Sequence, residues 1–166
     1  MKLKKIAAIL LAASMLPLSA CQDSNHVQLD PSAPTAIEIW HYYNGAQKEA
    51  FDSLVTEFNE TVGREQGIVV EAFSQGNVND LIQKVMDAAD KKVGASEIPD
   101  IFAAYVDTAY AVDQRGLVAS LDPYLSEEDL SQYVDAYIEE GRFDQEGNLK
   151  IFPVAKSTEV FMLNKT

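Results

Sequence analysis

The stretch IEIWHYYNGAQKEAFDSLVTEF, residues 37–58, sets the pattern that the rest of the chain repeats. Apolar and polar residues alternate over residues 36–40, which predicts a short β-strand. After Gly45 the apolar residues recur every three or four positions, which predicts an amphipathic helix. Its expected inward face consists of Ala50, Phe51, Leu54, Val55, Phe58 and Val62. A polar and aromatic turn, residues 40–45, therefore lies between a strand and a helix.

The same succession of strand, turn and helix follows twice more. A strand is expected over residues 68–73, then a helix whose inward face contains Leu81, Ile82, Val85, Met86 and Ala89. A third strand is expected over residues 101–106, followed by a helix that Asp107 and Thr108 begin. Alternating strands and helices imply right-handed crossovers and a largely parallel sheet with helices on both faces. The fold class is therefore α/β.

Beyond Gly116 the pattern is less regular. Residues 117–121 read as a short extended segment, and Ser126 to Asp129 resembles a capping box that begins another helix. That helix would carry Leu130, Tyr133, Val134, Tyr137 and Ile138 at helical spacing. Residues 143–152 are typical of a β-hairpin, and residues 160–163 of a final strand.

In a parallel sheet, ligands bind beside the carboxyl ends of the strands. The loops expected there are residues 40–45, 74–79 and 105–108. They offer aromatic faces and planar polar side chains, the groups that line small-molecule sites. The candidate faces are Trp40, Tyr42 and Tyr43, and the candidate hydrogen-bonding groups are His41, Asn44, Asn77 and Asp107. Alternatives remain: Trp40 could fill the core, His41 could be a solvated turn residue, and one of the adjacent tyrosines could serve packing.

Composition excludes several classes of function. With 26 acidic and 13 basic residues the net charge is -13, which opposes binding to nucleic acid. A simple reading of this charge is solubility. Cys21 is the single cysteine, so no disulfide forms within the chain, and no Cys/His cluster has zinc spacing. Neither a metal nor a cofactor is expected.

The N-terminus has the features of an export signal. Lys2, Lys4 and Lys5 precede a short apolar run, residues 6–13, which is too short to span a bilayer. The following Leu18-Ser19-Ala20-Cys21 resembles the bacterial lipobox. That resemblance implies a signal peptide over residues 1–20 and a lipid, such as palmitate, on Cys21. Residues 21–36 read as a flexible tether. The alternative is an ordinary secretory signal with an incidental cysteine.

Four pieces, taken in order, resemble a known family. They are Trp40-His41 with a helix ending in Phe58-Asn59, then Gly76-Asn77, then Pro99-Asp100-Ile101, and finally Phe152-Pro153 followed by Ser157-Thr158 and residues 160–165. The chain is similar to the extracellular solute-binding proteins (family 1) of bacterial ABC importers, in the carbohydrate and glycerol-3-phosphate branch.

The resemblance implies a periplasmic-binding-protein-like (type II) lobe that is incomplete. Residues 37–152 would form the N-terminal lobe, and residues 153–166 would lead toward a hinge and a second lobe, as in an N-terminal fragment. It adds Ser157 and Thr158 to the candidate ligand-binding residues. Val78 and Glu159 replace a Tyr and a Pro that are common in the family, which favours sugars over glycerol phosphodiesters.

The implied function is a lipid-anchored, extracytoplasmic and monomeric substrate-binding component. It would capture a sugar-like solute and deliver it to the membrane subunits of a permease. A ligand-sensing lipoprotein for a membrane receptor would use the same cleft. Asp100 and Asp107 could be read as the paired carboxylates of a glycoside hydrolase. No nucleophile, P-loop or metalloprotease motif is present in the sequence, so an enzyme is not expected.

Overall fold

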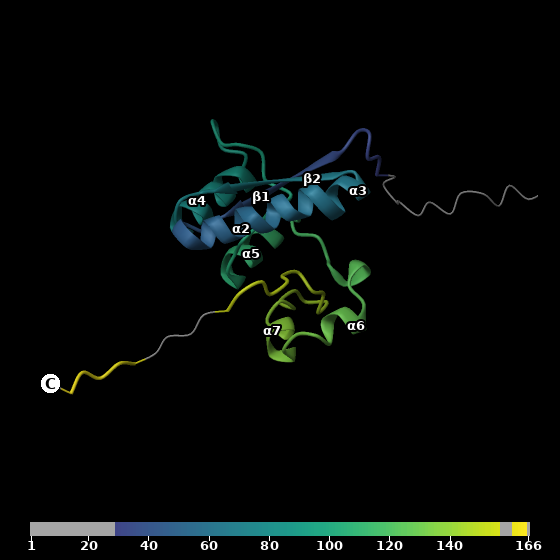
Figure 1. The fold of residues 1–166 in the computed structure, drawn as a ribbon. Helices are drawn as coiled ribbons and strands as arrows, with labels where there is room; N and C mark the ends of the chain where they lie inside the picture. The colour runs from purple at the N-terminus through teal and green to yellow at the C-terminus, as the bar shows by residue number, and fades with distance from the viewer. Residues whose placement is uncertain (1–28, 157–160, 166) are drawn as a thin grey trace, which may run out of the picture.

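The computed structural model describes residues 29–156 and 161–165. Its centre is a parallel sheet in the order β2-β1-β3, made of β1 (Thr35–His41), β2 (Ile68–Ser74) and β3 (Ile101–Phe102) (Figure 1). β1 pairs with β2 from Thr35↔Ile68 to His41↔Ser74, and with β3 through Ile39↔Ile101 and Trp40↔Phe102. The predicted α/β class and parallel sheet are confirmed.

The helices that flank the sheet begin where the sequence pattern places them, with one exception. α2 (Gly45–Phe58) continues through a π-helical turn η1 (Asn59–Gly63) into α3 (Arg64–Gln66), and α4 (Val78–Ala89) follows β2. α5 (Val106–Asp113) begins before the predicted Asp107-Thr108 cap, because β3 ends at Phe102 rather than at residue 106. Tyr105, in extended conformation, is its N-cap.

The two faces of the sheet are covered differently. Trp40, 5% exposed, packs with Leu81, Val85 and Ala88 of α4 and Val112 of α5. The next residue, His41, contacts the ring of Phe51 in α2 at 4.9 Å between centroids. Because successive side chains of a strand point to opposite faces, α4 and α2 lie on opposite sides of β1. The predicted inward stripe of α4 is confirmed by its buried Leu81 and Val85.

The predicted inward stripe of α2 is wrong in part. Leu54 is 63% exposed and Val62 is 52% exposed, whereas Phe51, Val55 and Phe58 are half-buried. Within residues 29–156 and 161–165 the sheet has three strands, so it accommodates a narrow row of contacts from the helix. The π-helical turn over η1 also changes the angle per residue and moves Val62 away from the expected face.

Asn59, the first residue of η1, protects the outer edge of β2. Its side-chain Nδ2 donates to the Val70 carbonyl at 2.9 Å, and its Oδ1 accepts from the Val70 N–H at 2.8 Å. The N–H and the carbonyl of Val70 both point away from β1, and without Asn59 they would be available to pair with another strand. Satisfying them with one amide side chain removes part of the exposed edge of the sheet.

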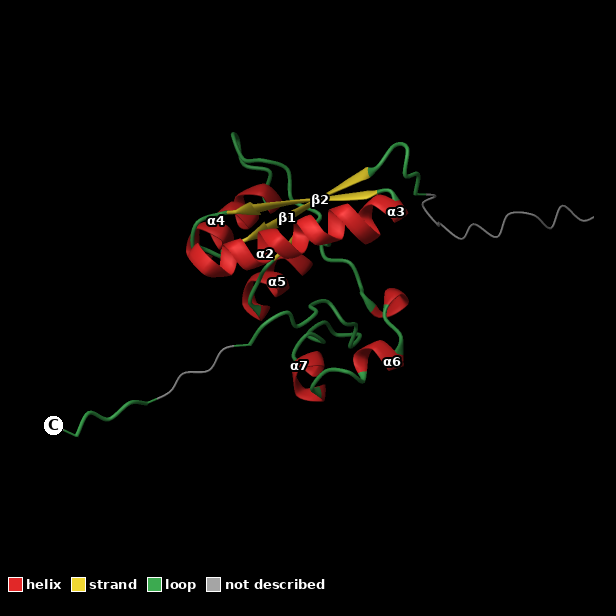
Figure 2. Ribbon diagram, viewed as in Figure 1, coloured by secondary structure: helices red, strands yellow, loops and turns green. Residues whose placement is uncertain are grey.

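Residues 117–156 pack as short helices and turns, namely η2 (Asp122–Tyr124), α6 (Glu127–Leu130) and α7 (Asp135–Glu139) (Figure 2). The capping box of Ser126 and Asp129 is confirmed, with both reciprocal hydrogen bonds present. The single predicted helix is wrong: it breaks between α6 and α7. Of its apolar face only Ile138 is buried, while Tyr133, Val134 and Tyr137 are exposed, so little packing supports a continuous helix.

Two predicted extended elements also differ. The segment 143–152 forms a turn without strand pairing, because Asp144 binds the N–H and side-chain amide of Asn148 at 2.7 and 2.8 Å. Residues 117–121 carry no strand either. Of the predicted strand at residues 160–163, residues 161–163 lie outside any helix or strand and are exposed, and residue 160 lies outside the described residues.

Polar contacts hold this C-terminal segment together and to α5. The Asp122 carboxylate accepts from the Arg142 guanidinium and the Leu149 N–H, both at 2.7 Å, and these bonds lower the pKa of Asp122 to about 2. Its contribution to stability is therefore present above the ordinary carboxyl pKa and is lost as the pH falls toward 2. Lys150 Nζ lies 3.1 Å from Asp113 Oδ1 in α5.

Gly141→Ala tests the close packing of this segment. Gly141 is buried, and an added Cβ would lie 2.2 Å from the Ile151 carbonyl oxygen and 2.9 Å from Leu149 Cδ1. We expect the free energy of unfolding to fall by about 1–3 kcal/mol, measured by urea denaturation.

Gly116→Asn is the matched control. Gly116 has φ +70 and no neighbour within 4 Å of an added Cβ, and asparagine tolerates this backbone region. Its free energy of unfolding should stay within about 0.5 kcal/mol of the parent chain. Equal stability of the Gly141→Ala variant and the parent would contradict the packing described here.

Candidate functional site

Two loops meet at the carboxyl edge of the sheet and are hydrogen-bonded to each other. The Gln75 N–H donates to the His41 carbonyl at 2.8 Å, and Ser74 Oγ donates to the Tyr43 carbonyl at 2.9 Å. Asn44 Nδ2 donates to the carbonyl of Gly76 and, at 3.1 Å, to that of Tyr42. The loops after β1 and β2 therefore form one continuous wall, which we call the edge wall (residues 42–45 and 74–77).

Asn77 ends the edge wall and begins α4. Its Oδ1 accepts from the N–H groups of Asn79 and Asp80 at 2.9 and 3.1 Å, and its Nδ2 donates to the Asp80 carboxylate at 2.6 Å. These bonds make Asn77 the N-cap of α4. Its exposed amide lies at the edge of the sheet, and its Oδ1 already accepts hydrogen bonds from the first turn of the helix.

Tyr105 adds an aromatic group to the edge wall from the third strand loop. It lies beside Tyr42: burial first, and then interaction with Tyr105, raises the pKa of Tyr42. Tyr105 is 56% exposed, and the Tyr42 and Tyr43 ring centroids lie 5.5 Å apart. Sequence reasoning left Tyr105 out of its candidate set. It was expected near the end of the third strand, residues 101–106, and its place in the loop expected at residues 105–108 was the signal that could have found it.

Asp107 lies two residues further on, in the first turn of α5. It is exposed, and its Oδ1 accepts from the Thr108 N–H at 2.7 Å. An acidic side chain in the first turn of a helix interacts favourably with the helix dipole. Asp107 therefore stabilises the start of α5 and leaves part of its carboxylate open to solvent near Tyr105.

Trp40 and His41 are placed in the interior, on opposite faces of β1. Trp40 is 5% exposed and its indole N–H donates to the Glu38 carboxylate. His41 is 1% exposed, and its Nδ1 accepts from the Tyr43 N–H at 3.1 Å. Neither side chain reaches the solvent side of the edge wall in this structure. Ser157 and Thr158 lie outside the described residues.

Burial has the largest effect on the pKa of His41. It lowers the pKa of the imidazole, Asp52 acts in the opposite direction, and Lys48 lowers the pKa further. Lys48 and Asp52 are themselves ion-paired on the first turns of α2. The neutral imidazole is therefore the stable form at neutral pH.

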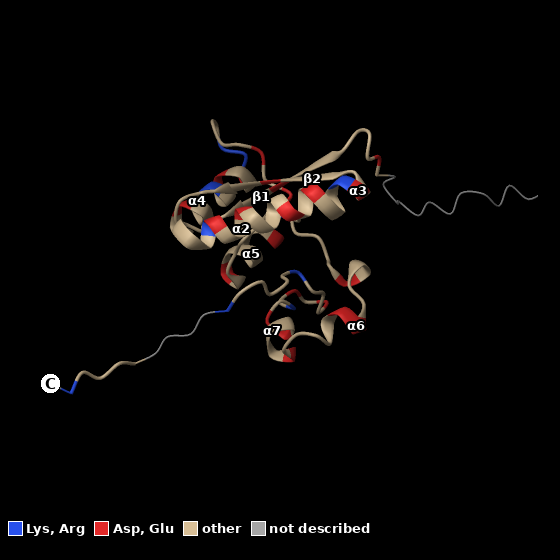
Figure 3. Cartoon of the chain, in the orientation of Figure 1, with Lys and Arg blue, Asp and Glu red and all other residues tan. Residues whose placement is uncertain are grey.

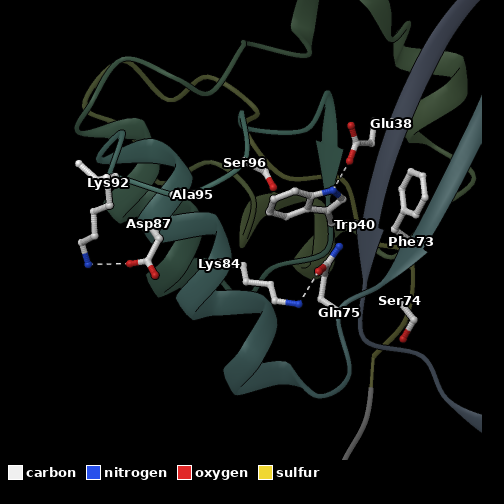
Figure 4. Close-up of a pocket in the computed structure, with 12 residues that line it drawn as sticks. Glu38, Trp40, Phe73, Ser74, Gln75, Lys84, Asp87, Lys92, Ala95 and Ser96 are labelled. Carbon is white, nitrogen blue, oxygen red and sulfur yellow. Dashed lines mark hydrogen bonds and ion pairs between the residues drawn. The ribbon is translucent and has the colours of Figure 1, made fainter.

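A hollow of about 620 Å³ lies beside the edge wall, on the face of the sheet that α4 covers (Figure 4). Glu38, Trp40 and Phe73 come from the strands, Lys84 and Asp87 from α4, and residues 92–96 close it. Its charged groups are already engaged: Lys84 Nζ donates to Gln75 Oε1 at 2.9 Å and Lys92 Nζ to Asp87 Oδ1 at 2.6 Å. Only Ser74 and Gln75 belong to both the hollow and the edge wall.

The surface around the site is acidic. Figure 3 shows Asp and Glu spread over the helices rather than gathered in one place. Within residues 29–156 and 161–165, no three His, Cys, Asp or Glu side chains are grouped as metal ligands would be. Across the same residues, no helix has the length and apolar character that a bilayer crossing requires.

Solved structures share this fold. A cyclic α-maltosyl-1,6-maltose binding protein from Arthrobacter globiformis superimposes with a TM-score of 0.57 at 22% identity, over 68% of this chain and 27% of that chain. CpMnBP1 with mannotriose bound gives a TM-score of 0.53 at 18% identity, over 69% and 27%. A family 1 extracellular solute-binding protein from Bifidobacterium longum subsp. infantis gives 0.52 at 16%, over 71% and 27%.

These identities show a common fold, and the chain spans about a quarter of the length of the solved structures it matches. No curated protein sequence matches the chain significantly. The family model of bacterial extracellular solute-binding proteins matches residues 53–166, more than half of the chain. The chain therefore belongs to the bacterial extracellular solute-binding protein family.

Proposed function

We propose that this chain supplies one wall of the solute site of an ABC importer's substrate-binding component, and that the solute is a saccharide. The observation that carries the proposal is that Tyr42 and Tyr105 interact beside Asn44 and Asn77 at the carboxyl edge of the sheet. Ligands of open parallel sheets bind at this edge. Membership of the solute-binding family supports the same role.

The chemistry of the edge wall suits a sugar. Tyrosine rings cover C–H surfaces, and amide groups meet hydroxyls in the plane of the ring. The matching structures include one protein named for a maltosyl-maltose and one with mannotriose bound. Ser157 and Thr158 remain proposed contacts of the same solute. Asp107 is a proposed hydroxyl acceptor, because part of its carboxylate faces solvent.

The alternatives use the same site in other ways. A sensor for a membrane receptor would bind the solute equally, and interaction with permease subunits rather than a receptor separates the two roles. A glycoside hydrolase would need two free carboxyl groups facing one bond. Asp100 Oδ2 accepts from the Glu38 N–H at 2.8 Å, and Asp107 accepts from the Thr108 N–H. Both carboxylates stabilise backbone, so the geometry favours binding over hydrolysis.

The signal peptide, the lipid anchor and the tether are part of the proposal. Residues 1–28 lie outside the described residues. We propose a signal peptide over residues 1–20, a lipid on Cys21, a tether that ends where β1 begins at Thr35 rather than at residue 36, and a monomer held on the extracytoplasmic side of a membrane. Residues 37–152 would be the N-terminal lobe, with residues 153–166 leading to the hinge. The family's extracellular placement supports this location.

Calorimetric titration of the intact protein that carries this chain with maltotriose, mannotriose and xylotriose tests the solute class. We expect binding of at least one, without product formation. Tyr42→Ala and Tyr105→Ala should each weaken that binding roughly fivefold, since an aromatic contact is worth about 1 kcal/mol beyond burial. Tyr124→Ala is the control, because Tyr124 is 79% exposed on η2. Hydrolysis of the sugars would contradict the proposal.

Asn44→Asp tests the coupling of the two loops. Aspartate keeps the shape of asparagine but lacks the amide that donates to the Gly76 and Tyr42 carbonyls. We expect the backbone amides of residues 74–77 to exchange hydrogen faster, measured by mass spectrometry. Asn79→Asp, an exposed position in the first turn of α4, should leave exchange at residues 74–77 as it is in the parent. Equal exchange in both variants would show that Asn44 does not join the loops.

Cys21→Ala tests the lipid anchor. Expression in bacteria with labelled palmitate should label the parent chain and not the variant, and the variant should leave the membrane fraction. Label retained after Cys21 is replaced, or absent from the parent, would overturn the anchor.

A further inference from the structure

His41 is the exception to an otherwise satisfied interior. Among the buried side-chain nitrogen and oxygen atoms of residues 29–156 and 161–165, His41 Nε2 alone has no hydrogen-bond partner. The imidazole is 1% exposed. Leaving such a donor unpaired is unfavourable, so a buried unpaired group in a native fold calls for an explanation.

The hydrogen bond at the other ring nitrogen fixes the tautomer. Nδ1 accepts from the Tyr43 N–H at 3.1 Å, so Nδ1 carries no proton in the neutral imidazole. The proton of neutral His41 is therefore on the unpartnered Nε2. The lone pair of the neutral ring that can accept a proton is therefore on Nδ1, the same nitrogen that accepts the hydrogen bond from the Tyr43 N–H of the edge wall.

The surroundings of the ring are mostly apolar. Its centroid lies 5.3 Å from that of Tyr43, in a stacked arrangement, and 4.9 Å from that of Phe51, edge to face. The titratable groups that act on its pKa are Asp52 and Lys48 of α2, which pair with each other. From β2, the residue in register with His41 is Ser74, which does not titrate.

We propose that His41 is a positioning residue and an acid-sensitive latch for the edge wall: its neutral Nδ1 holds the Tyr43 N–H, and protonation releases the turn that carries Tyr42, Tyr43 and Asn44. The inference deepens the proposed function and rests on it for its effect on solute affinity. The latch responds to a proton from solvent and needs no other reactant.

The step follows from the donor and acceptor inventory of imidazole. A proton from solvent adds to the Nδ1 lone pair, the ring becomes a cation with two N–H donors, and the Tyr43 N–H loses its acceptor. Tyr43 cannot move alone, because its carbonyl accepts from Ser74 Oγ. Displacement of Tyr43 therefore disturbs both halves of the edge wall.

The direction of the pH effect follows from burial. Since burial lowers the pKa of His41, the neutral ring stabilises the fold. That contribution is complete above the unfolded pKa of about 6.5 and is lost as the pH falls through it toward the lower folded pKa. Asp52 counters part of the lowering, so the latch responds nearer to neutral pH than burial alone would allow.

A ligand-free experiment tests the latch on the intact protein. With ¹⁵N-tyrosine labelling, the seven tyrosines of the chain give a small set of amide signals. From about pH 7.5 to about pH 4.5, the Tyr43 amide should shift with the His41 imidazole signal while the Tyr124 and Tyr133 amides do not. His41→Asn keeps an acceptor at the Nδ1 position but does not titrate, so the shift should disappear.

Affinity for whichever of maltotriose, mannotriose or xylotriose binds supplies the second readout. The parent should bind roughly tenfold more weakly at the acid end than at the neutral end. His41→Phe, which has no acceptor, should bind weakly at both ends. His41→Asn should recover affinity relative to His41→Phe, with a flat pH profile.

The outcomes separate the two proposals. A Tyr43 shift that is absent, or that persists in His41→Asn, overturns the latch, as does loss of the whole far-ultraviolet circular dichroism signal at the same pH. A flat pH profile of affinity in the parent overturns it as well. If no saccharide binds but Tyr43 titrates with His41, the solute proposal fails and the conformational latch stands.

Discussion

Parallel pairing of β1 with β2 on one side and β3 on the other is the constraint from which the remaining structure follows. It places three carboxyl ends at one edge, and therefore brings together the loops that carry Tyr42, Asn44 and Tyr105. In the part of the chain that the structure describes, it also makes β1 the one strand with neighbours on both sides. The side chains at its end, Trp40 and His41, consequently point into opposite layers and are both buried.

Backbone groups that the small sheet leaves unpaired are satisfied by side chains. Asn59 binds both outward groups of Val70, and Asn44 binds the carbonyl of Gly76. In the C-terminal segment, Asp122 accepts the Leu149 N–H and an Arg142 guanidinium. Unpaired backbone groups away from water are costly, so these polar residues stabilise turns that have little apolar packing of their own.

His41 connects the core to the edge wall. Its ring packs under α2 against Phe51, while its Nδ1 holds the backbone of the exposed turn. A contact of this kind lets an event in the interior alter the position of residues at the surface without a change in the sheet. The same placement explains why a residue that borders a proposed solute site is itself hidden from solvent.

The amino-acid sequence by itself determined the α/β class, the succession of the first three strands along the chain and the capping box at Ser126. Hydrophobic period and capping chemistry are local properties, so the sequence contains them. It also marked the turn after β1 as the place of interest. It misjudged the length of β3, the continuity of the helix after Ser126 and the stripe of α2. Those depend on how much surface each segment finds to bury, which no local pattern contains.

The candidate site divides in the same way. Residue type and position after a strand were enough to nominate Tyr42, Tyr43, Asn44, Asn77 and Asp107. Only the tertiary structure decided that Trp40 and His41 face the core, that Tyr105 lies beside Tyr42, and that His41 leaves Nε2 unpaired. The physical reason is that the direction of a side chain at the end of a strand is set by the layers packed on each face of the sheet, and those layers come from residues distant in the sequence.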